Sequence, residues 1–370
     1  MRTLQLQEAE DILYGACIYG TGGGGSLSEG LEIIKNIYRN GKEIKLIALE
    51  DVKDHWLVAS PYYVGSVAPP SDEIVQKLKG LKPVKENVST IATRILQKNL
   101  REEIKCICAT ELGGNTAWAM EVAASLDIPL VDADPAGRAV PDLAQTTFNI
   151  FDVSIAPFAL ANRYGDTLVV ETAASHDRAE AIARTFATIS GNYSGICDHP
   201  VKGEKFRTSV IEGTISKAQA VGRAMRLANE DGVNPIETIT LAGDGKILFK
   251  GTVSEASWEE VRGFIEGTIN IKSDNLKDEM SVWFRNENMT ARIADKIVSI
   301  IPELIIILDY QTGKPLLNPS CKAGMEVAVL SFPAPTIWET DKGLSIFGPE
   351  YIGMEKKDYL NLKIINGMGK

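Results

Sequence analysis

The sequence predicts two domains: an N-terminal three-layer α/β domain with a mostly parallel sheet, and a C-terminal β-rich, barrel-like domain. Before about residue 166, short apolar runs alternate with helical patterns, as in a buried parallel sheet. After about residue 238, apolar runs are separated by Asp-Gly, Thr-Gly and Lys-Gly pairs, as in antiparallel sheets. A chain of 370 residues is long enough for both. We expect the domains to span residues 1–166 and 167–370.

The first expected elements are two helices, because residues 7–18 and 26–41 place apolar side chains at helical spacing. The loop between them reads GTGGGGS, and five of its seven residues are glycine. No strand precedes it, so it lacks the context of a dinucleotide-binding fingerprint. We expect its backbone N–H groups to bind an anion or a carbonyl oxygen; the alternative is a tight crossing between helices. The candidate binding residues are Gly22, Gly23, Gly24 and Gly25.

Strand-length apolar runs follow at residues 43–52, 55–60, 104–110, 128–134 and 147–155. Three loops come after the second, third and fourth of these runs, where we expect the carboxyl ends of the strands. Ligands of open α/β sheets bind beyond the carboxyl ends of the strands. We therefore expect all three loops to contribute to one site, and the first of them contains Ser66.

The second loop, TELGGNTAW, places Glu111 just after a buried strand and before a helix. Its glycines are Gly113 and Gly114, and Asn115 or the next residue is the expected N-cap. A carboxylate beside a helix N-terminus and glycine N–H groups could position a substrate N–H or activate a water molecule. The alternative is a solvated loop carboxylate beside an ordinary cap.

The third loop, VDADPAGRAVPDL, contains Asp132, Asp134 and Arg138. Residues two apart in an extended stretch point to the same side, so the two carboxylates should repel unless a cation intervenes. Arg138 is the nearest cation in the sequence. Such a pair suits a division into acid and base, or could hold a divalent cation such as Mg²⁺. The alternative is ordinary turn chemistry around Pro and Gly.

The C-terminal domain should begin with two helices near residues 176–191 and 214–230, followed by strands. The expected strands include residues 237–256 and 343–348. Asn286 and Glu287 stand in a polar triplet within a β context; they form either a solvated face or part of the site.

The remaining reactive side chains are expected to be structural. Cys106 and Cys108 have no zinc or redox spacing, so we interpret them as small core residues. The three histidines, His55, His176 and His199, have no metal-binding spacing and are expected to be structural or exposed.

Composition narrows the function classes. The net charge of −10 and the pI of about 5.1 argue against nucleic acid or an anionic membrane as the main partner. No apolar stretch reaches the length of a membrane span. The five cysteines are an odd number, which we interpret as reduced thiols in a cytoplasmic protein.

Several segments together resemble the S-methyl-thiohydantoin desulfurase-like family, whose members often lie beside, or are fused to, hydantoinase/oxoprolinase-type proteins. These segments are GACIYGTGGGGS, ELGGNTAWAM, VDADPAGRAVPDL, IEGTISKAQAVGRA, FRNENMTA, GMEVAVLSFPAP and GLSIFGPEYIG. The chain departs from the family pattern at Val67, at Arg285 and in its short Gly-Gly-Asn run. The resemblance implies the two-domain fold and a cyclic ureide-like substrate.

We therefore expect a hydrolase-like enzyme that uses carboxylate-activated water on a hydantoin or thiohydantoin, with Asp132, Asp134 and Glu111 as catalytic residues. No cofactor is expected beyond a divalent cation at Asp132 and Asp134. The expected partners are a small-molecule substrate, further copies of the chain and a hydantoinase/oxoprolinase-like protein. The alternatives are a non-catalytic binding or regulatory subunit of a hydantoinase-like complex, and a nucleotide- or phosphate-binding module.

Overall fold

The computed structural model describes residues 1–65, 70–261, 263–273, 278–294 and 296–359. The chain divides into two compact units that are interleaved along the sequence. The first unit comprises Met1–Ala9, Ser28–Ala136 and Asp142–Thr214, and the second comprises Glu10–Leu27, Gly137–Pro141 and Ile215–Lys370. The predicted domain boundary at residue 166 stays a prediction. The units differ from that division because the glycine-rich segment groups with the C-terminal part of the chain.

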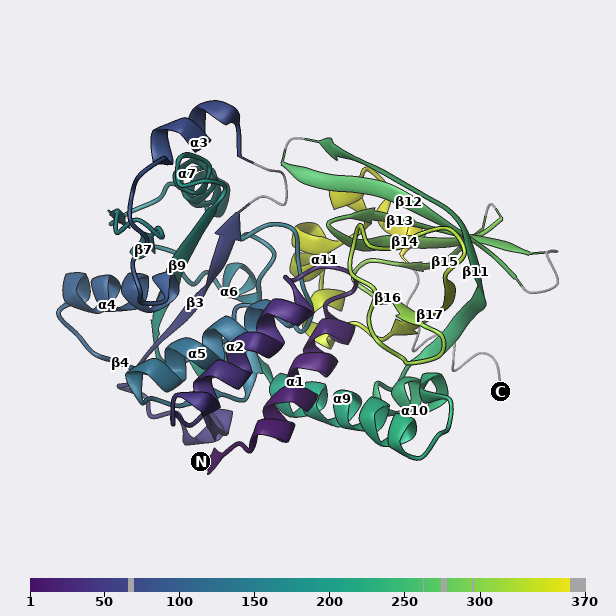
Figure 1. The fold of residues 1–370 in the computed structure, drawn as a ribbon, viewed down its shortest axis with the longest axis horizontal. Coiled ribbons are helices and arrows are strands. Elements are labelled where there is room, and N and C mark those ends of the chain that lie inside the picture. The colour runs from purple at the N-terminus through teal and green to yellow at the C-terminus, as the bar shows by residue number, and fades with distance from the viewer. Residues whose placement is uncertain (66–69, 262, 274–277, 295, 360–370) are drawn as a thin grey trace. The chain divides into compact units, whose positions relative to one another are not determined.

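The first unit contains a mixed sheet of eight strands in the order β1-β2-β5-β4-β3-β9-β7-β8 (Figure 1). The four strands β2, β5, β4 and β3 are parallel, which confirms the predicted parallel arrangement for the centre of the sheet. The flanking strands β1, β9, β7 and β8 pair antiparallel, so the sheet is less uniformly parallel than predicted. The bounds are β1 (Arg2–Thr3), β2 (Lys45–Ile47), β3 (Leu57–Gly65), β4 (Ile104–Ile107), β5 (Leu130–Val131), β7 (Phe158–Ala161), β8 (Thr167–Val170) and β9 (Tyr193–Lys202).

Helices cover both faces of this sheet, as neighbouring residues of β9 show. Ile196 packs in an apolar cluster with Ala183 and Phe186 of α7, whereas the Cys197 thiol lies within hydrogen-bonding reach of Thr93 on α4. Successive strand residues point to opposite faces, so α4 and α7 lie on opposite sides and form a three-layer unit. The helices are α2 (Leu27–Arg39), α3 (Asp72–Leu78), α4 (Val88–Leu100), α5 (Asn115–Leu126), α6 (Thr147–Ile150), α7 (His176–Ile189) and α8 (Gly203–Arg207). A small ribbon pairs β6 (Ala133–Asp134) with β10 (Ile211–Glu212).

The second unit contains an antiparallel sheet of seven strands in the order β15-β14-β13-β12-β11-β17-β16 (Figure 1). The sheet curls on itself, as a contact between strands that are not neighbours in the sheet shows. Asn288 of β14 donates a hydrogen bond to the Ile305 carbonyl of β16 at 3.0 Å. Ser299 of β15 and Ser331 of β17 likewise lie 2.9 Å apart through their hydroxyl oxygens. In the part of the chain that is described, the strand order does not close, so the sheet is a half-barrel. The strands are β11 (Lys246–Val261), β12 (Phe264–Lys272), β13 (Glu279–Arg285), β14 (Glu287–Ile293), β15 (Lys296–Ile300), β16 (Leu304–Asp309) and β17 (Glu326–Phe332).

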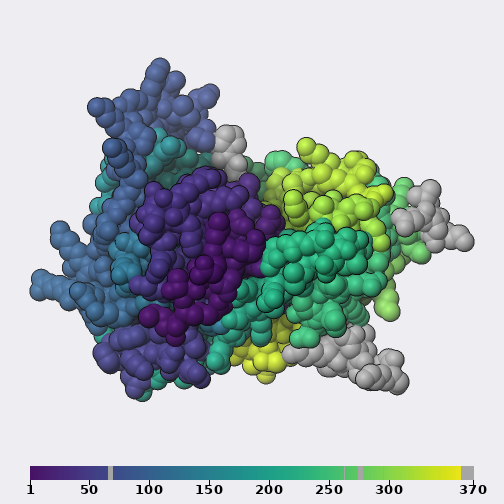
Figure 2. All heavy atoms as spheres, turned by 60° about the horizontal axis from the view of Figure 1, so that its bottom comes forward, coloured from purple at the N-terminus to yellow at the C-terminus, as the bar shows by residue number. Residues whose placement is uncertain are grey.

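Helices of the second unit pack on β16 and β17 through an apolar cluster that includes Ile18, Val221, Ile236, Ile306 and Leu330. They are α1 (Leu6–Tyr19), α9 (Thr214–Glu230), α10 (Pro235–Ala242) and α11 (Asp341–Phe347); the first four residues of α1 belong to the first unit. Figures 1 and 2 both show α9 running beside α1. Short 3-10 helices span Leu49–Asp51, Thr336–Glu339, Pro349–Ile352 and Lys356–Asp358.

Small residues allow α1 and α9 to approach closely. A Cβ atom at Gly15 would lie 1.8 Å from the Ala218 carbonyl oxygen, and one at Gly222 would lie 1.9 Å from the Asp11 carbonyl oxygen. Beside this crossing, the buried Asp11 carboxylate accepts two hydrogen bonds from Arg226, at 2.8 and 2.9 Å. Among the described residues, no helix is both apolar enough and long enough to span a bilayer.

Two strand predictions, residues 147–155 and 343–348, are wrong, and a third, residues 237–256, is wrong at its start. Residues 147–150, 237–242 and 343–347 are helical, in α6, α10 and α11. Short apolar runs do not separate helix from strand by periodicity. For α10 and α11, capping decides the outcome, because Asn234 and Thr340 accept hydrogen bonds from N–H groups of the first turn.

Candidate functional site

Two of the three predicted loops leave the carboxyl ends of neighbouring parallel strands. The segment with Glu111 follows β4, and the segment with Asp132 follows β5. Ser66 of the first loop lies outside the described residues. Glu111 is only 8% exposed and Asp134 is fully buried, so these carboxylates are not solvated surface groups.

The Glu111 loop is held by its own side chains. Asn115 donates from its amide to the Glu111 carboxylate at 2.8 Å, and Gly113 donates its N–H to the Thr116 hydroxyl at 3.2 Å. Helix α5 begins at Asn115 with Gly114 as its N-cap, one position earlier than predicted. Asn115 therefore orients Glu111 and does not cap the helix.

The two aspartates of the third loop have different environments. The extended backbone is interrupted at Asp132, between β5 and β6. The Asp132 N–H donates to the Ile47 carbonyl, and the Asp132 carbonyl accepts from the Gly213 N–H. Asp132 is half-buried, whereas Asp134 is buried and accepts the N–H of Ala136 at 2.7 Å. A cation between them stays a prediction. Within the described ranges, no group of three or more His, Cys, Asp or Glu residues could hold a metal ion.

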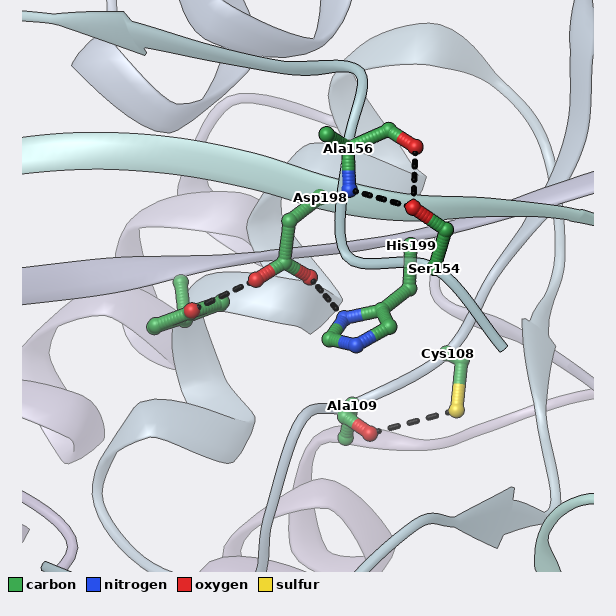
Figure 3. A network of polar contacts seen from close by, with 7 residues as sticks. Cys108, Ala109, Ser154, Ala156, Asp198 and His199 are labelled. Atoms are coloured by element: carbon green, nitrogen blue, oxygen red, sulfur yellow. Dashed lines mark hydrogen bonds and ion pairs between the residues drawn. The ribbon is translucent and has the colours of Figure 1, made fainter. Parts of the chain in front are cut away.

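A buried polar network lies in the first unit around His199, which the sequence predicts to be structural or exposed (Figure 3). His199 donates from Nδ1 to one oxygen of Asp198 at 2.8 Å, and Tyr62 donates its hydroxyl to the other at 2.6 Å. All three side chains are at most 4% exposed. Burial and then Asp198 raise the pKa of Tyr62 well above its ordinary value, so its hydroxyl stays a donor.

This network interacts electrostatically with the loops that contain Glu111 and Asp134. The Tyr62 hydroxyl lies within electrostatic range of Glu111 as well as Asp198. Cys108, which directly follows β4, lies within range of both Asp134 and Asp198. Burial, followed by the charge of Asp134, raises the pKa of Cys108 well above the ordinary thiol value, so this thiol is neutral.

The sequence contained one signal for this network. Asp198 and His199 are adjacent polar residues inside the otherwise apolar run ICDHPV, at a position where β9 is buried. A polar, titratable pair inside a buried strand needs partners, and this is a reason to suspect a site.

The glycine-rich loop lies in the second unit. Thr21, Gly22, Gly24 and Gly25 have φ values of +50°, +94°, +75° and +97°, which explains three of the glycines. At Gly23 a Cβ would lie 1.9 Å from Oε1 of Glu287, so this glycine makes room for a buried carboxylate. The Gly23 N–H itself bonds to the Gly20 carbonyl at 2.8 Å.

Arg138 is also part of the second unit and is fully buried. Its guanidinium donates at 3.0 Å each to the Pro302 and Glu303 carbonyls and to the Thr21 hydroxyl. Burial lowers the pKa of Arg138 to about 10, while Glu287 and Glu303 oppose that shift. Arg138 thus ties the glycine loop to the half-barrel.

Asn286 forms the turn between β13 and β14 with a φ of +55°, and it exchanges two hydrogen bonds with Ile265. The predicted site residues therefore form two groups. Glu111, Gly113, Gly114, Asn115, Asp132 and Asp134 lie in the first unit, and the glycine loop, Arg138, Asn286 and Glu287 lie in the second. A single cleft that joins both groups stays a prediction.

Comparisons with known proteins agree with this fold. Residues 7–172 match the family model described as the S-Me-THD-like N-terminal domain, and residues 174–362 match the S-Me-THD-like C-terminal domain. No curated protein matches the chain. A crystal structure of a structural-genomics target protein from Chromobacterium violaceum matches with a TM-score of 0.78 and 20% identity, covering 98% of this chain and 100% of that one. At this identity the match shows the fold alone. Because the two family models cover nearly the whole sequence, the chain belongs to the S-Me-THD-like family.

Proposed function

We propose that the chain is a hydrolase that acts on a hydantoin- or thiohydantoin-type cyclic ureide. The observation that carries this proposal is the position of Asp134 and Glu111, two buried carboxylates in the loops after adjacent parallel strands. Sites at the carboxyl ends of such strands bind small ligands. The family description supplies the class of substrate.

The reaction of an S-methyl thiohydantoin fits these side chains. Water attacks the ring carbon that bears the sulfur, and methanethiol leaves. The attack needs a base, and the departing sulfur needs an acid. Asp134 or Asp132 would accept a proton of the attacking water, and Glu111, oriented by Asn115, would accept the ring N–H. Backbone N–H groups of the segment that contains Glu111 would hold the ring carbonyl.

The contacts of the glycine loop argue against the alternative of a phosphate-binding module. A phosphate nest needs several N–H groups that face one ligand. In this loop the Gly23 N–H bonds within the loop, and the Glu287 carboxylate occupies the space beside Gly23. A negative charge at that place disfavours a bound anion.

The direct test is turnover of S-methyl-2-thiohydantoin by the purified chain. Methanethiol is followed with a thiol reagent and hydantoin by mass spectrometry. We expect Asp134→Asn to lower kcat by at least about 100-fold, the lower bound for a general acid–base group. Asp127→Asn is the matched control, because Asp127 is an exposed helix C-cap in the same unit.

Three outcomes would contradict the proposal. Unchanged kcat in a folded Asp134→Asn variant would remove Asp134 from the mechanism. Binding of hydantoin without turnover would favour the non-catalytic subunit. Protection against heat by nucleotides alone would favour the phosphate-binding module, since a ligand in excess stabilises the protein that it binds. Assembly with further copies, a hydantoinase/oxoprolinase-like partner and a cytoplasmic location are part of the same proposal, and co-purification and size measurements test the first two.

A further inference from the structure

Three buried side-chain nitrogens in the first unit lack a hydrogen-bond partner among the described residues: Nε2 of Gln145, of His176 and of His199. His199 is the more deeply buried of the two histidines and is only 2% exposed. Buried polar atoms are nearly always hydrogen-bonded, so an exception calls for an explanation such as a ligand or a catalytic role. Figure 3 shows Nε2 of His199 pointing away from Asp198, toward the segment that carries Cys108 and Ala109.

The opposite nitrogen of the ring is fixed. A carboxylate accepts hydrogen bonds and does not donate them, so Nδ1 of His199 carries the proton that bonds to Asp198. Tyr62 holds the second carboxylate oxygen. In a neutral imidazole this arrangement leaves the lone pair on Nε2, which makes Nε2 a proton acceptor. Carboxylates orient catalytic histidines in the same way in hydrolases with a Ser-His-Asp triad.

The backbone is shaped to place this ring. Ser60 pairs with Asp198 and Val58 pairs with Val201, so β9 has one more residue than β3 between these pairs. This β-bulge gives His199 a φ of +43°. Neighbouring side chains of a regular strand point to opposite faces, whereas here Asp198 and His199 meet at 2.8 Å. Bulges of this kind often re-aim a side chain next to an active site.

The ring is also held on its faces. The Phe148 ring stacks on it with 4.6 Å between centroids, and the His176 ring lies at 5.8 Å. The backbone N–H of His199 bonds to the Ile155 carbonyl at 3.2 Å. Next to that residue, the Ser154 hydroxyl bonds to both the N–H and the carbonyl of Ala156 (Figure 3). Such support is typical of a side chain whose orientation matters.

Neutral groups surround His199 apart from the aspartates. Burial, followed by His199, lowers the pKa of His176 to about 4, so His176 is neutral near pH 7. The thiol of Cys108 and the phenol of Tyr62 are neutral as well, because their pKa values are raised. Asp198 orients His199 directly, and both Asp134 and Asp198 interact electrostatically with Cys108.

We propose that His199, oriented by Asp198, is a catalytic acid–base residue that transfers protons through Nε2; this rests on the proposed function. In the first step Nε2 takes a proton from water as the oxygen bonds to the ring carbon, and it passes that proton to the ring nitrogen. In the second step Nε2 takes the remaining hydroxyl proton, and the carbonyl forms as the carbon–sulfur bond breaks. Nε2 gives that proton to the departing sulfur. Water and S-methyl-2-thiohydantoin thus become hydantoin and methanethiol, and His199 returns to its first state.

The division of work with the carboxylates follows from their positions. In this mechanism His199 replaces Asp134 as the base that takes the proton of water, and Asp134 would orient that water and stabilise the protonated ring of His199 through space. Asp198 and Tyr62 are positioning residues, because they act through the imidazole. Cys108 would remain a neutral thiol.

The test begins with the protein itself, because the sequence has only three histidines. Selective ¹⁵N labelling of histidine gives three side-chain spin systems, and His55→Asn and His176→Asn assign them. We expect His199 to be protonated at Nδ1 and unprotonated at Nε2. Saturating hydantoin should shift the Nε2 signal of His199 and leave His55 unchanged. In Asp198→Asn the carboxylate is lost, so the fixed Nδ1-protonated form should be lost too.

Turnover of S-methyl-2-thiohydantoin gives the second readout. His199→Asn keeps a donor toward Asp198 and suits a positive φ, yet it has no Nε2. It should lower kcat by at least about 100-fold with little change in KM. His199→Gly also tolerates this φ, and added imidazole should restore part of its activity, which a purely structural defect would not allow.

The outcomes separate the two proposals. Suppose that the wild-type chain turns over substrate, that hydantoin does not shift the Nε2 signal, and that His199→Asn keeps its kcat. The role of His199 is then overturned and the proposed function stands. If no cyclic ureide binds or reacts, the proposed function fails and the role of His199 fails with it.

Discussion

Replacing Gly23 with alanine would place a methyl group where the Glu287 carboxylate lies. The new Cβ would be 1.9 Å from Oε1, 2.6 Å from Cδ and 2.8 Å from Cγ, whereas ordinary contact begins at 3.4 Å. The nearest oxygen must therefore move by roughly 1.5 Å. Glu287 is only 3% exposed, so its side chain has little room to move. Overpacking of this kind lowers the free energy of unfolding by about 1–3 kcal/mol.

A double-mutant cycle tests whether Glu287 causes this loss. Urea unfolding is followed by circular dichroism for the wild type, Glu287→Gln and Glu287→Ala, each with and without Gly23→Ala. The cost of Gly23→Ala should persist in the Glu287→Gln background, because glutamine has the shape of glutamate. It should fall by at least about 1 kcal/mol in the Glu287→Ala background, where the obstructing atoms are removed. An equal cost in all backgrounds, or no cost in the wild type, would refute the explanation of the glycine.

Two further predictions concern other parts of the molecule. Gly222→Ala should destabilise the protein more than Gly232→Ala in urea, because its Cβ would meet the Asp11 carbonyl at 1.9 Å, whereas Gly232→Ala meets no atom within 4 Å and costs only the strain of its φ of +69°; a loss no larger than that of Gly232→Ala would contradict the close helix crossing. The pKa of His176 is lowered to about 4, first by burial and then by His199. Between pH 6.5 and 4 the unfolded chain therefore binds a proton that the folded chain does not, and stability is lost as the pH falls through this window. His176→Asn should remove that part of the loss between about pH 7 and about pH 5, and an unchanged pH dependence would argue against a buried neutral His176.

Much of the fold could be predicted from local patterns. The runs of β3 and β5 are buried on both faces over most of their length, and β4 is buried except at Lys105, as central strands of a parallel sheet require. The loops with Glu111 and Asp132 could therefore be placed at the correct edge of the sheet. The helices α6, α10 and α11 could not be predicted in this way, because each is short and apolar.

The site depends on contacts that no local pattern reveals. The glycine run by itself predicts a ligand nest, whereas at Gly23 the neighbour is a carboxylate from β14. His199 has no characteristic spacing, and its role depends on a bulge and on Tyr62, which is 136 residues from Asp198 in the sequence. Such pairings exist only once the sheet has formed.

Helix α1, which carries Ile18, limits where this protein can be divided into fragments. Ile18 belongs to the same apolar cluster as Ile306 and Leu330, although the family model of the C-terminal domain begins at residue 174. A C-terminal fragment that begins at that border would lack α1, one of the helices that cover the half-barrel. It would therefore expose apolar surface to water. The borders of the two family models are thus not the borders of independently folding domains. A chain cut at that border would fold only when both fragments are produced together.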